Sequence, residues 1–474
     1  MCTFTLLANK FFAEFDYLIE KHKHEPATEQ QNDLRGRQKL LIYLLKSENI
    51  VSDKMGFLAI FALVVSSQIG SGIFMLPISL APYGMYSPIS SIISGFGAIS
   101  LALVFALLCA KFPRTGGPHV YVKHAFGSTV AFFVGWTYWI SSWISSTAVT
   151  IASVGYLAPL FHDNIQNIRL LLEMALVLAI MLINLRGVNT VGRVELLLTV
   201  IKIVVLLVIP VVALFFFDRN NFIISEEVSN FTTSQILAHS TLLALWCFIG
   251  LESATASAGS VDNPAKTIPR AIVLGTICVA IIYFINNFAI MGLISGSELA
   301  DSRAPYVDAV KIMFPGNWHV IASVVAFIVS VSNLNTSFLT DGQVTLGLAK
   351  DKLMPKLFAK RNKYNAPFYG IILSTLGVLV LLVLTSNKNF AEQVTSMINI
   401  SMVSFLFIYL VSSFAFLKIA MQEKIYYKLL IGSVTILFCC WIIYEIPIST
   451  LLMSNLFPLS GTLIYLFWYR KSIR

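Results

Sequence analysis

The chain has 474 residues, of which 57% are hydrophobic and 12% charged, and its mean hydropathy is +0.78. This composition excludes a soluble globular protein and indicates a membrane protein. The formal net charge of +9 does not indicate a nucleic-acid partner, because the basic residues collect in loops between apolar segments. The six cysteines show no metal-ligand spacing, so we expect neither a metal nor another cofactor.

Twelve apolar segments are long enough to cross a bilayer, which takes ~20 helical residues. They lie at about 57–81, 86–110, 126–160, 168–185, 194–217, 236–258, 271–295, 317–349, 367–386, 391–417, 427–444 and 447–469. The third and eighth are long, and we expect them to be tilted. The sequence therefore predicts an all-α membrane protein with about twelve transmembrane helices, embedded in lipid.

Lys and Arg collect in alternate loops, for example at Lys111, Arg186 and Lys266. The positive-inside rule then places both termini in the cytoplasm, and we expect a multi-pass protein of the cell (inner) membrane. Residues 1–54 are polar and lack the features of a signal peptide. They are predicted to be a cytoplasmic tail, which is disordered, includes a short amphipathic helix at Gln38–Lys46, or arises from a start codon upstream of Met55. Residues 55–474 form the membrane domain.

Two of the apolar segments contain helix-breaking sequences near their middle. The first is Ile69-Gly70-Ser71-Gly72-Ile73 and the second is Ile249-Gly250-Leu251-Glu252-Ser253-Ala254. Glycine forms helices poorly, and a glutamate in the bilayer core costs several kcal/mol. Freed backbone groups persist at this depth only where protein or a water-filled cavity satisfies them.

The two breaks fall in the first and sixth predicted spans, so five spans separate equivalent points. An odd number of spans per unit inverts the second unit. The sequence therefore predicts a five-plus-five inverted repeat, about 57–217 and 236–417, with two final helices at 427–469. The alternative, that Gly70 and Gly72 only allow close helix packing, does not explain Glu252 at the partner position.

Four motifs in this order resemble the amino acid–polyamine–organocation transporter superfamily. They are IGSGIF at 69–74, PRTGGPHVYV at 113–122, LWCFIGLESATASAGSVDNPAKTIPRA at 245–271 and LAKDKLMPK at 348–356. The chain is most similar to the branch with the arginine–agmatine antiporter, from about Val51 to Arg474. The resemblance implies a LeuT-type fold with two broken helices, and a secondary active transporter of amino acids or related amines that works by alternating access, often as an antiporter.

The breaks themselves suit the two charged ends of an α-amino acid. Free amides beyond Gly72 and the positive end of the half-helix dipole favour a carboxylate. Carbonyl groups near Ile249 and Gly250 favour an ammonium group. A simple amine would leave the first break unpaired. The predicted substrate-binding residues are Gln68, Ile69, Gly70, Ser71, Gly72, Ser142, Ser146, Trp246, Cys247, Ile249, Gly250 and Ser337.

The predicted gating or proton-coupling residues are Tyr138, Lys202, Trp246 and Glu252. The resemblance implies that Trp246 stacks on the substrate as a gate and that Glu252 acts in gating or proton coupling. In several relatives a lysine at the position of Lys202 reaches the first break, which favours the alternative of proton-coupled symport. The competing interpretations are a packing tryptophan, a structural glutamate bonded to freed amides, and a snorkelling lysine.

Polar residues recur at helical spacing on two further segments: Ser142, Ser146, Thr150 and Ser153, and then Ser330, Asn333, Ser337 and Asp341. They line a cavity or link helices. Asp341 is a candidate partner for a cationic substrate, Lys202 or a loop lysine. His119, in the cytoplasmic loop motif Pro113–Tyr121, is either a pH sensor or, more in keeping with its loop position, a solvated histidine.

The sequence departs from the arginine exchanger at several positions. Ser146 stands where the exchanger has an asparagine, Ser337 where it has a tryptophan, and Ser67-Gln68 where it has asparagine and isoleucine. Arginine is therefore not assigned as the substrate. No HExxH, P-loop or Ser/His/Asp set occurs, so we expect a transporter and not an enzyme. A non-transporting sensor is a distant alternative, and a homodimer is possible.

Overall fold

The computed structural model describes residues 54–466 except 71, 158–159, 161–164, 303, 387–389 and 447. The predictions for the N-terminal tail and for Ser71 lie outside these residues. Within them, the chain is helical, and the only extended pairings are two isolated bridges, Met55 with Val261 and Tyr83 with Ile224. The prediction of an all-α protein is therefore confirmed.

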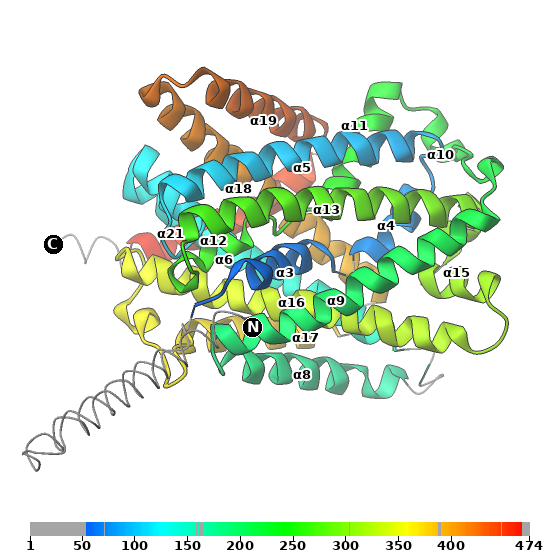
Figure 1. The fold of residues 1–474 in the computed structure, drawn as a ribbon, viewed down its shortest axis with the longest axis horizontal. Helices are drawn as coiled ribbons and strands as arrows, with labels where there is room; N and C mark the ends of the chain where they lie inside the picture. Colours follow the sequence, from blue (N-terminus) through cyan, green and yellow to red (C-terminus); the bar gives the residue numbers. More distant parts are fainter. Residues whose placement is uncertain are drawn as a thin grey trace, which may run out of the picture. The chain divides into compact units, whose positions relative to one another are not determined.

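The long helices follow the predicted segments in chain order (Figure 1). The first five segments correspond to α3 (Phe57–Gln68) with α4 (Gly72–Leu80), α5 (Tyr86–Lys111), α6 (Pro118–Gly155), α8 (Ile165–Asn184) and α9 (Val188–Ala213). The next five correspond to α11 (Thr233–Trp246) with α12 (Ser253–Ala256), α13 (Pro264–Leu293), α16 (Trp318–Lys350), α17 (Phe368–Thr385) and α18 (Phe390–Glu423). The last two correspond to α19 (Tyr426–Glu445), and to α20 (Ile448–Ser454) with α21 (Leu456–Ile464).

Short elements connect these helices. They are η2 (Leu214–Phe216), η3 (Arg219–Asn221), α10 (Glu226–Ser229), η4 (Ala258–Ser260), α14 (Gly296–Asp301), α15 (Pro305–Met313) and η5 (Lys356–Ala359). By length and apolarity, eight helical spans of the described residues can cross a membrane. The other four predicted segments coincide with α6, α8, α11–α12 and α20–α21, which are not among these eight spans of the described residues.

The third and the last predicted segments differ from the helices in detail. Helix α6 begins at Pro118, but its backbone is non-helical at Gly127, which has a φ of +83°, a value that glycine adopts without strain. The predicted start at 126 therefore coincides with the kink between the two parts of α6. The last predicted segment, 447–469, is not one helix. It divides into α20 and α21, which meet at Asn455.

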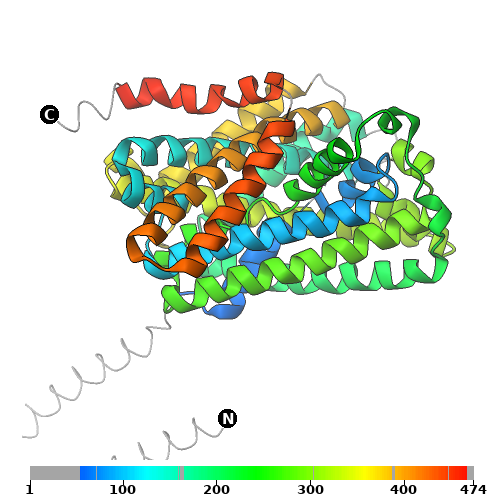
Figure 2. The ribbon, with the colours of Figure 1, turned by 90° about the horizontal axis from the view of Figure 1, so that it is seen from above.

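Contacts between the two halves occur in reciprocal pairs. The first helix of each half packs on the second helix of the other half, as α3 on α13 and α11 on α5. The fifth helix of each half likewise packs on the third helix of the other, as α18 on α6 and α9 on α16. Figures 1 and 2 both show α5 and α13 side by side. Such reciprocity is what two inverted five-helix units produce.

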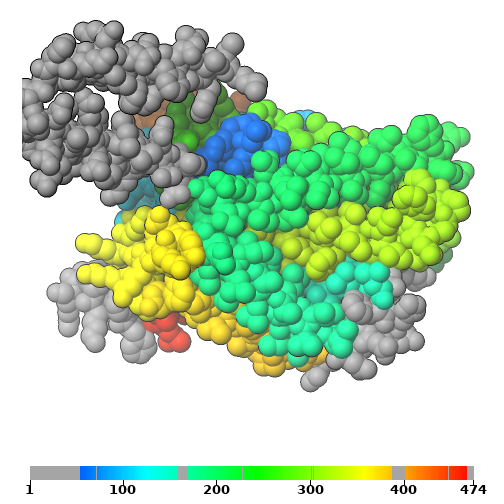
Figure 3. All heavy atoms as spheres, turned by 60° about the horizontal axis from the view of Figure 1, so that its bottom comes forward, coloured from blue at the N-terminus to red at the C-terminus, as the bar shows by residue number. Residues whose placement is uncertain are grey.

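Helix α9 shows how this domain divides its surfaces between lipid and interior. Leu197, Val200, Val204 and Val208 are each more than half exposed, whereas Glu195, Thr199 and Lys202 on the other face are buried. Figure 3 shows α9, in green, along the surface of the domain. Apolar residues outside and polar residues inside are typical of a helix that separates lipid from a polar interior.

Candidate functional site

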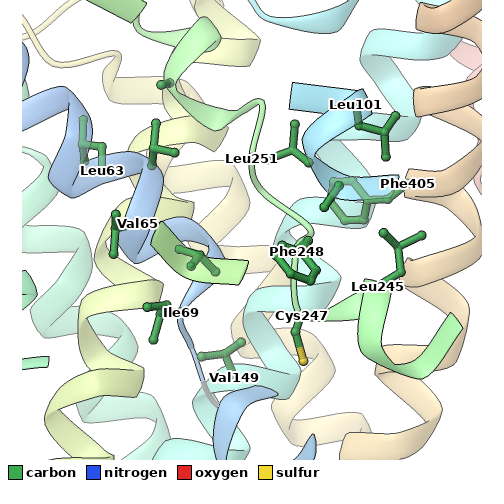
Figure 4. Packing of buried hydrophobic residues seen from close by; sticks show 14 of the residues in the cluster. Leu63, Val65, Ile69, Leu101, Val149, Leu245, Cys247, Phe248, Leu251 and Phe405 are labelled. Carbon is green, nitrogen blue, oxygen red and sulfur yellow. The ribbon is translucent and has the colours of Figure 1, made fainter. Parts of the chain in front are cut away.

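Helix α3 ends at Gln68, and the chain leaves the helix at Ile69, which is extended with φ −83° and ψ +95°. Helix α4 then begins at Gly72. Figure 4 shows this segment beside the second break, with Ile69 on one and Cys247 and Phe248 on the other. The last carbonyl groups of α3 and the first amides of α4 therefore lack partners within a helix.

Side chains from three other helices satisfy the freed carbonyl groups of α3. The Asn333 amide donates to the carbonyls of Ser66 and Ser67 at 2.9 and 2.8 Å. The Tyr283 hydroxyl donates to Gln68 O at 2.6 Å, and Lys202 Nζ donates to Ile69 O at 2.7 Å. The carbonyl end of the first break is thus occupied by protein and is not free for a ligand.

The second break is tightened instead of unwound, contrary to the expectation of free backbone groups. Five amides between Cys247 and Ser253 bond to the carbonyl three residues earlier, as in Ile249 N to Trp246 O at 3.1 Å. Gly250 has a φ of +102°, a conformation that glycine adopts without strain. Its carbonyl already accepts from the Ser67 hydroxyl at 2.8 Å, so Gly250 does not offer the free carbonyl that the sequence predicted for an ammonium group.

The two breaks touch at their glycines. A Cβ atom on Gly72 would lie 3.0 Å from the Trp246 ring and 3.2 Å from Cys247 Sγ. A Cβ on Gly250 would lie 2.8 Å from Ser67 O. At Gly250 the contact is with backbone and is too short for a larger residue, so glycine is needed there for close approach as well as for conformation. At Gly72 a larger residue would require the Trp246 and Cys247 side chains to shift by a few tenths of an ångström.

A cavity of about 600 Å³, including its part open to solvent, lies between the two breaks. Both breaks, α6, α16 and α18 contribute to its wall. The lining residues are Ser67, Gln68, Gly70, Gly72, Tyr138, Ser142, Ser145, Val149, Trp246, Cys247, Ile249, Gly250, Glu252, Ser253, Asn333, Ser337, Thr340 and Phe405.

Glu252 is wholly buried at one side of this cavity and is held by two tyrosines. The Tyr138 hydroxyl donates to Oε1 at 2.8 Å, and the Tyr409 hydroxyl donates to Oε2 at 2.6 Å. Tyr409 also accepts a bond from Gly250 N at 3.3 Å. The carboxyl group thus joins α6, α18 and the second break through hydrogen bonds that must break if these helices separate.

Lys202 lies behind the first break and not in the cavity wall. Besides Ile69 O, its Nζ donates to the Ser66 hydroxyl at 2.9 Å. Ser66 lies 2.8 Å from the Ser332 hydroxyl, and Ser332 donates to the buried carboxyl of Glu195. A lysine and a glutamate on α9 are thus bridged by two hydroxyls, one from α3 and one from α16. This arrangement compensates both buried charges.

The chain matches the model of a family described as amino acid permease over residues 55–469. It belongs to the amino acid permease family. Putrescine transporter PotE of Haemophilus influenzae is 30% identical over 377 residues, which cover 79% of this chain and 86% of that protein. PotE of Escherichia coli is 30% identical over 76% of this chain and 82% of its own. The Escherichia coli cadaverine/lysine antiporter is 30% identical over 71% and 76%. The chain is therefore a multi-pass membrane transport protein that acts on a small molecule.

The structure of the permease brings most of the predicted site residues together. Those that line the cavity are Gln68, Gly70, Gly72, Tyr138, Ser142, Trp246, Cys247, Ile249, Gly250, Glu252 and Ser337. Ile69 and Lys202 bond to each other behind it. Ser146 does not line the cavity, because its hydroxyl turns back to the Ser142 carbonyl at 3.0 Å, and Ser145 lines it instead. Their roles in binding stay predictions.

Several residues of this permease site were not predicted from the sequence. Tyr283 and Tyr409 are buried tyrosines within apolar segments, and neither carries a local motif. The sequence showed Asn333 only as one member of a polar helix face. In the structure its side chain packs against Gly70, where an added Cβ atom would lie 2.7 Å from Asn333 Cγ. The available signal was an amide-bearing residue at membrane depth, which needs hydrogen-bond partners.

The loop between α5 and α6, together with the first turns of α6, packs on the C-terminal end of α16. His119 is wholly buried and its Nε2 lies 3.5 Å from Asp351, so the expectation of a solvated histidine is wrong. Lys123 Nζ lies 3.1 Å from the same carboxyl. Burial alone would raise the pKa of Asp351, but His119 and Lys123 outweigh it and lower that pKa to about 2.

Proposed function

We propose that this permease is an antiporter that exchanges cationic amino acids and α,ω-diamines across the cell (inner) membrane by alternating access, with both termini in the cytoplasm. The observation that carries the proposal is the cavity between the two breaks, which has the buried carboxyl of Glu252 and the Trp246 ring in its wall. None of the ion pairs among the described residues involves Glu252, so a cation in the cavity supplies the missing charge.

The relatives support this choice of substrate. Two of them are putrescine transporters and one is a cadaverine/lysine antiporter. Putrescine and cadaverine are diamines, and lysine carries a cationic side chain. A site that holds an ammonium group beside an aromatic ring and a carboxyl accommodates all three, since a cation over a tryptophan face gains ~0.5–2 kcal/mol.

Within this proposal, each part of the site has a role. The first amides of α4, from Gly72 on, bind a substrate carboxylate where one is present. The Ile249 carbonyl accepts no hydrogen bond from the described residues. It binds the ammonium group, for which the sequence had predicted the Ile249 and Gly250 carbonyls together. Trp246 covers the substrate from one side. The Tyr138–Glu252–Tyr409 bonds close the other side and open in the alternate state.

The alternative of proton-coupled symport through Lys202 is less favoured. Lys202 bonds to Ile69 O and Ser66 and is not in the cavity wall. Its side chain occupies the carbonyl end of the first break as a fixed internal cation. One relative is an antiporter, and a non-transporting sensor has no such support.

Counterflow in proteoliposomes tests the proposal. We expect uptake of labelled lysine or putrescine only when the vesicles contain an unlabelled cationic amino acid or diamine. Trp246→Leu should lower this exchange at least about tenfold while the protein still inserts. Uptake into empty vesicles driven by an imposed pH gradient would overturn antiport. Absence of exchange with every amino acid and amine would overturn the transport proposal.

A further inference from the structure

Asp341 is a second buried carboxyl next to the cavity, and no function described above uses it. It lies on α16 beside Thr340 and one helical turn from Ser337, both of which line the cavity. Its side chain is 0% exposed. Neither of its carboxyl oxygens accepts a hydrogen bond of ordinary geometry from the protein.

The polar neighbours of Asp341 connect it to the cavity wall. They are the hydroxyls of Ser142 on α6 and Ser374 on α17. Ser374 accepts a bond from Trp139 Nε1 at 2.8 Å, so its own hydroxyl hydrogen is free to point toward Asp341. Ser142 lines the cavity. A single hydroxyl therefore separates the Asp341 carboxyl from the space that holds the substrate.

The charges around Asp341 do not balance within the protein. None of the ion pairs among the described residues includes Asp341 or Glu252. Glu252 accepts bonds from two tyrosines, whereas the donors near Asp341 are the hydroxyls of Ser142 and Ser374, and neither makes a bond of ordinary geometry to it. A buried carboxylate without a cation or donors costs several kcal/mol. Asp341 is thus the group of this region that most needs a partner from outside the chain.

The position of Asp341 selects the part of the substrate that it meets. The two breaks bind the end of the substrate that carries the α-amino group. Ser142 of α6 and Thr340 of α16 line the part of the cavity that helices other than the two broken ones provide, and we place the other end of the substrate there. A distal ammonium group at that wall is within reach of Asp341, directly or through the Ser142 hydroxyl.

We propose that Asp341 provides the counter-charge for the distal ammonium group of the substrate, and so makes the permease select α,ω-diamines and cationic amino acids over substrates with a neutral end. This inference rests on the proposed function and extends it to a residue for specificity. Charge-assisted hydrogen bonds in a site shielded from water are strong enough for such selection.

Two amines that differ in one ammonium group test it. 1,4-Diaminobutane and 1-aminobutane are compared as inhibitors of labelled lysine exchange by the wild type and by Asp341→Asn. We expect the inhibition constant of the diamine to rise about tenfold or more in the variant, and that of the monoamine to change less than about twofold. Asp341→Glu should retain the preference for the diamine, because it keeps the charge.

Asp341→Ser is measured in parallel, so that a folding defect of one neutral variant does not decide the result. Ser330→Ala is the matched control, because Ser330 is buried on α16, donates to the Ala326 carbonyl at 2.9 Å and is not among the residues that line the cavity. An unchanged preference in both neutral variants overturns the inference, as does an equal loss for both amines, which indicates a structural role. A wild type that transports no cationic substrate overturns the proposed function itself.

Discussion

The two breaks satisfy their backbone groups in different ways. At the first break, long side chains reach the carbonyls: Asn333 from α16, Tyr283 from α13 and Lys202 from α9. At the second break, the chain bonds to itself in tight turns. The first break therefore depends on residues that are distant in sequence, whereas the second depends on Gly250 and its neighbours.

This difference separates a fixed part of the site from a movable one. Two of the three side chains at the first break, Asn333 and Tyr283, come from the second half of the chain, so the second half holds the first break in place. The hydrogen bonds of the second break to helices outside its half are single ones, as from Tyr138 to Glu252 and from Ser67 to the Gly250 carbonyl. Such bonds can be exchanged in an alternating-access movement at small cost.

The largest effect is expected at the movable break. Glu252→Ala should abolish exchange, because it removes the acceptor of two buried tyrosine hydroxyls and the charge that faces the cavity. Glu252→Gln keeps acceptor oxygen but loses the charge, and we expect it to retain a small fraction of the rate. The measurement is labelled-substrate exchange, normalised to inserted protein. Glu298→Ala, on the short helix α14, is the control. Near-normal exchange by Glu252→Ala would contradict the role of Glu252 in the gate.

At the fixed break, we expect substitutions to lower the stability of the protein. Lys202→Met leaves Ile69 O and the Ser66 hydroxyl without their donor and Glu195 without its bridged cation. We expect a loss of ~2–5 kcal/mol in the free energy of unfolding, seen as a lower melting temperature in detergent.

A double variant sharpens this expectation. Glu195→Gln combined with Lys202→Met removes both charges, so it should be less destabilised than Lys202→Met alone. The Ser332 hydroxyl can reverse its bond to suit the new amide. If the double variant instead loses the sum of the two single effects, the hydroxyl-bridged pair is not an energetic unit.

Much of the fold could be predicted from the sequence, because an apolar segment of ~20 residues by itself indicates a membrane-spanning helix. The exceptions are segments where that signal is weak. Helix α6 carries many small polar residues, and its first turns lie beyond a glycine kink that no apolar count detects. The last segment divides at Asn455, just before Pro458 in the first turn of α21, which has no amide to donate to the Ser454 carbonyl.

The site was predictable where chemistry is local and not where it is distant. Gly70, Trp246 and Glu252 are unusual at membrane depth, and the sequence points to them directly. The partners that occupy the freed groups, Tyr283 and Tyr409, are ordinary residues of apolar helices until the fold brings them to the breaks. For the same reason the sequence could not show that the Gly250 carbonyl is already used by Ser67.

Tyr283 is where the two breaks are joined, and its removal should have the smallest of these effects. Its hydroxyl faces Gln68 O at 2.6 Å and Cys247 O at 3.1 Å, so one group sets the spacing of the breaks. Tyr283→Phe should raise the KM for exchange about three- to tenfold, since the loss of one buried hydrogen bond costs ~1 kcal/mol and the substrate must then order both segments. We expect little change in kcat.

Tyr306→Phe is the matched control for this experiment, because Tyr306 is equally buried but donates to Asn286 at 2.8 Å, away from the breaks. Uptake kinetics of both variants at several substrate concentrations separate KM from kcat. An equal rise in KM in the control would mean that any buried hydroxyl of this region matters. A selective rise in Tyr283→Phe would show that the fixed break and the movable break are coupled through one side chain, and that the substrate binds to their shared geometry.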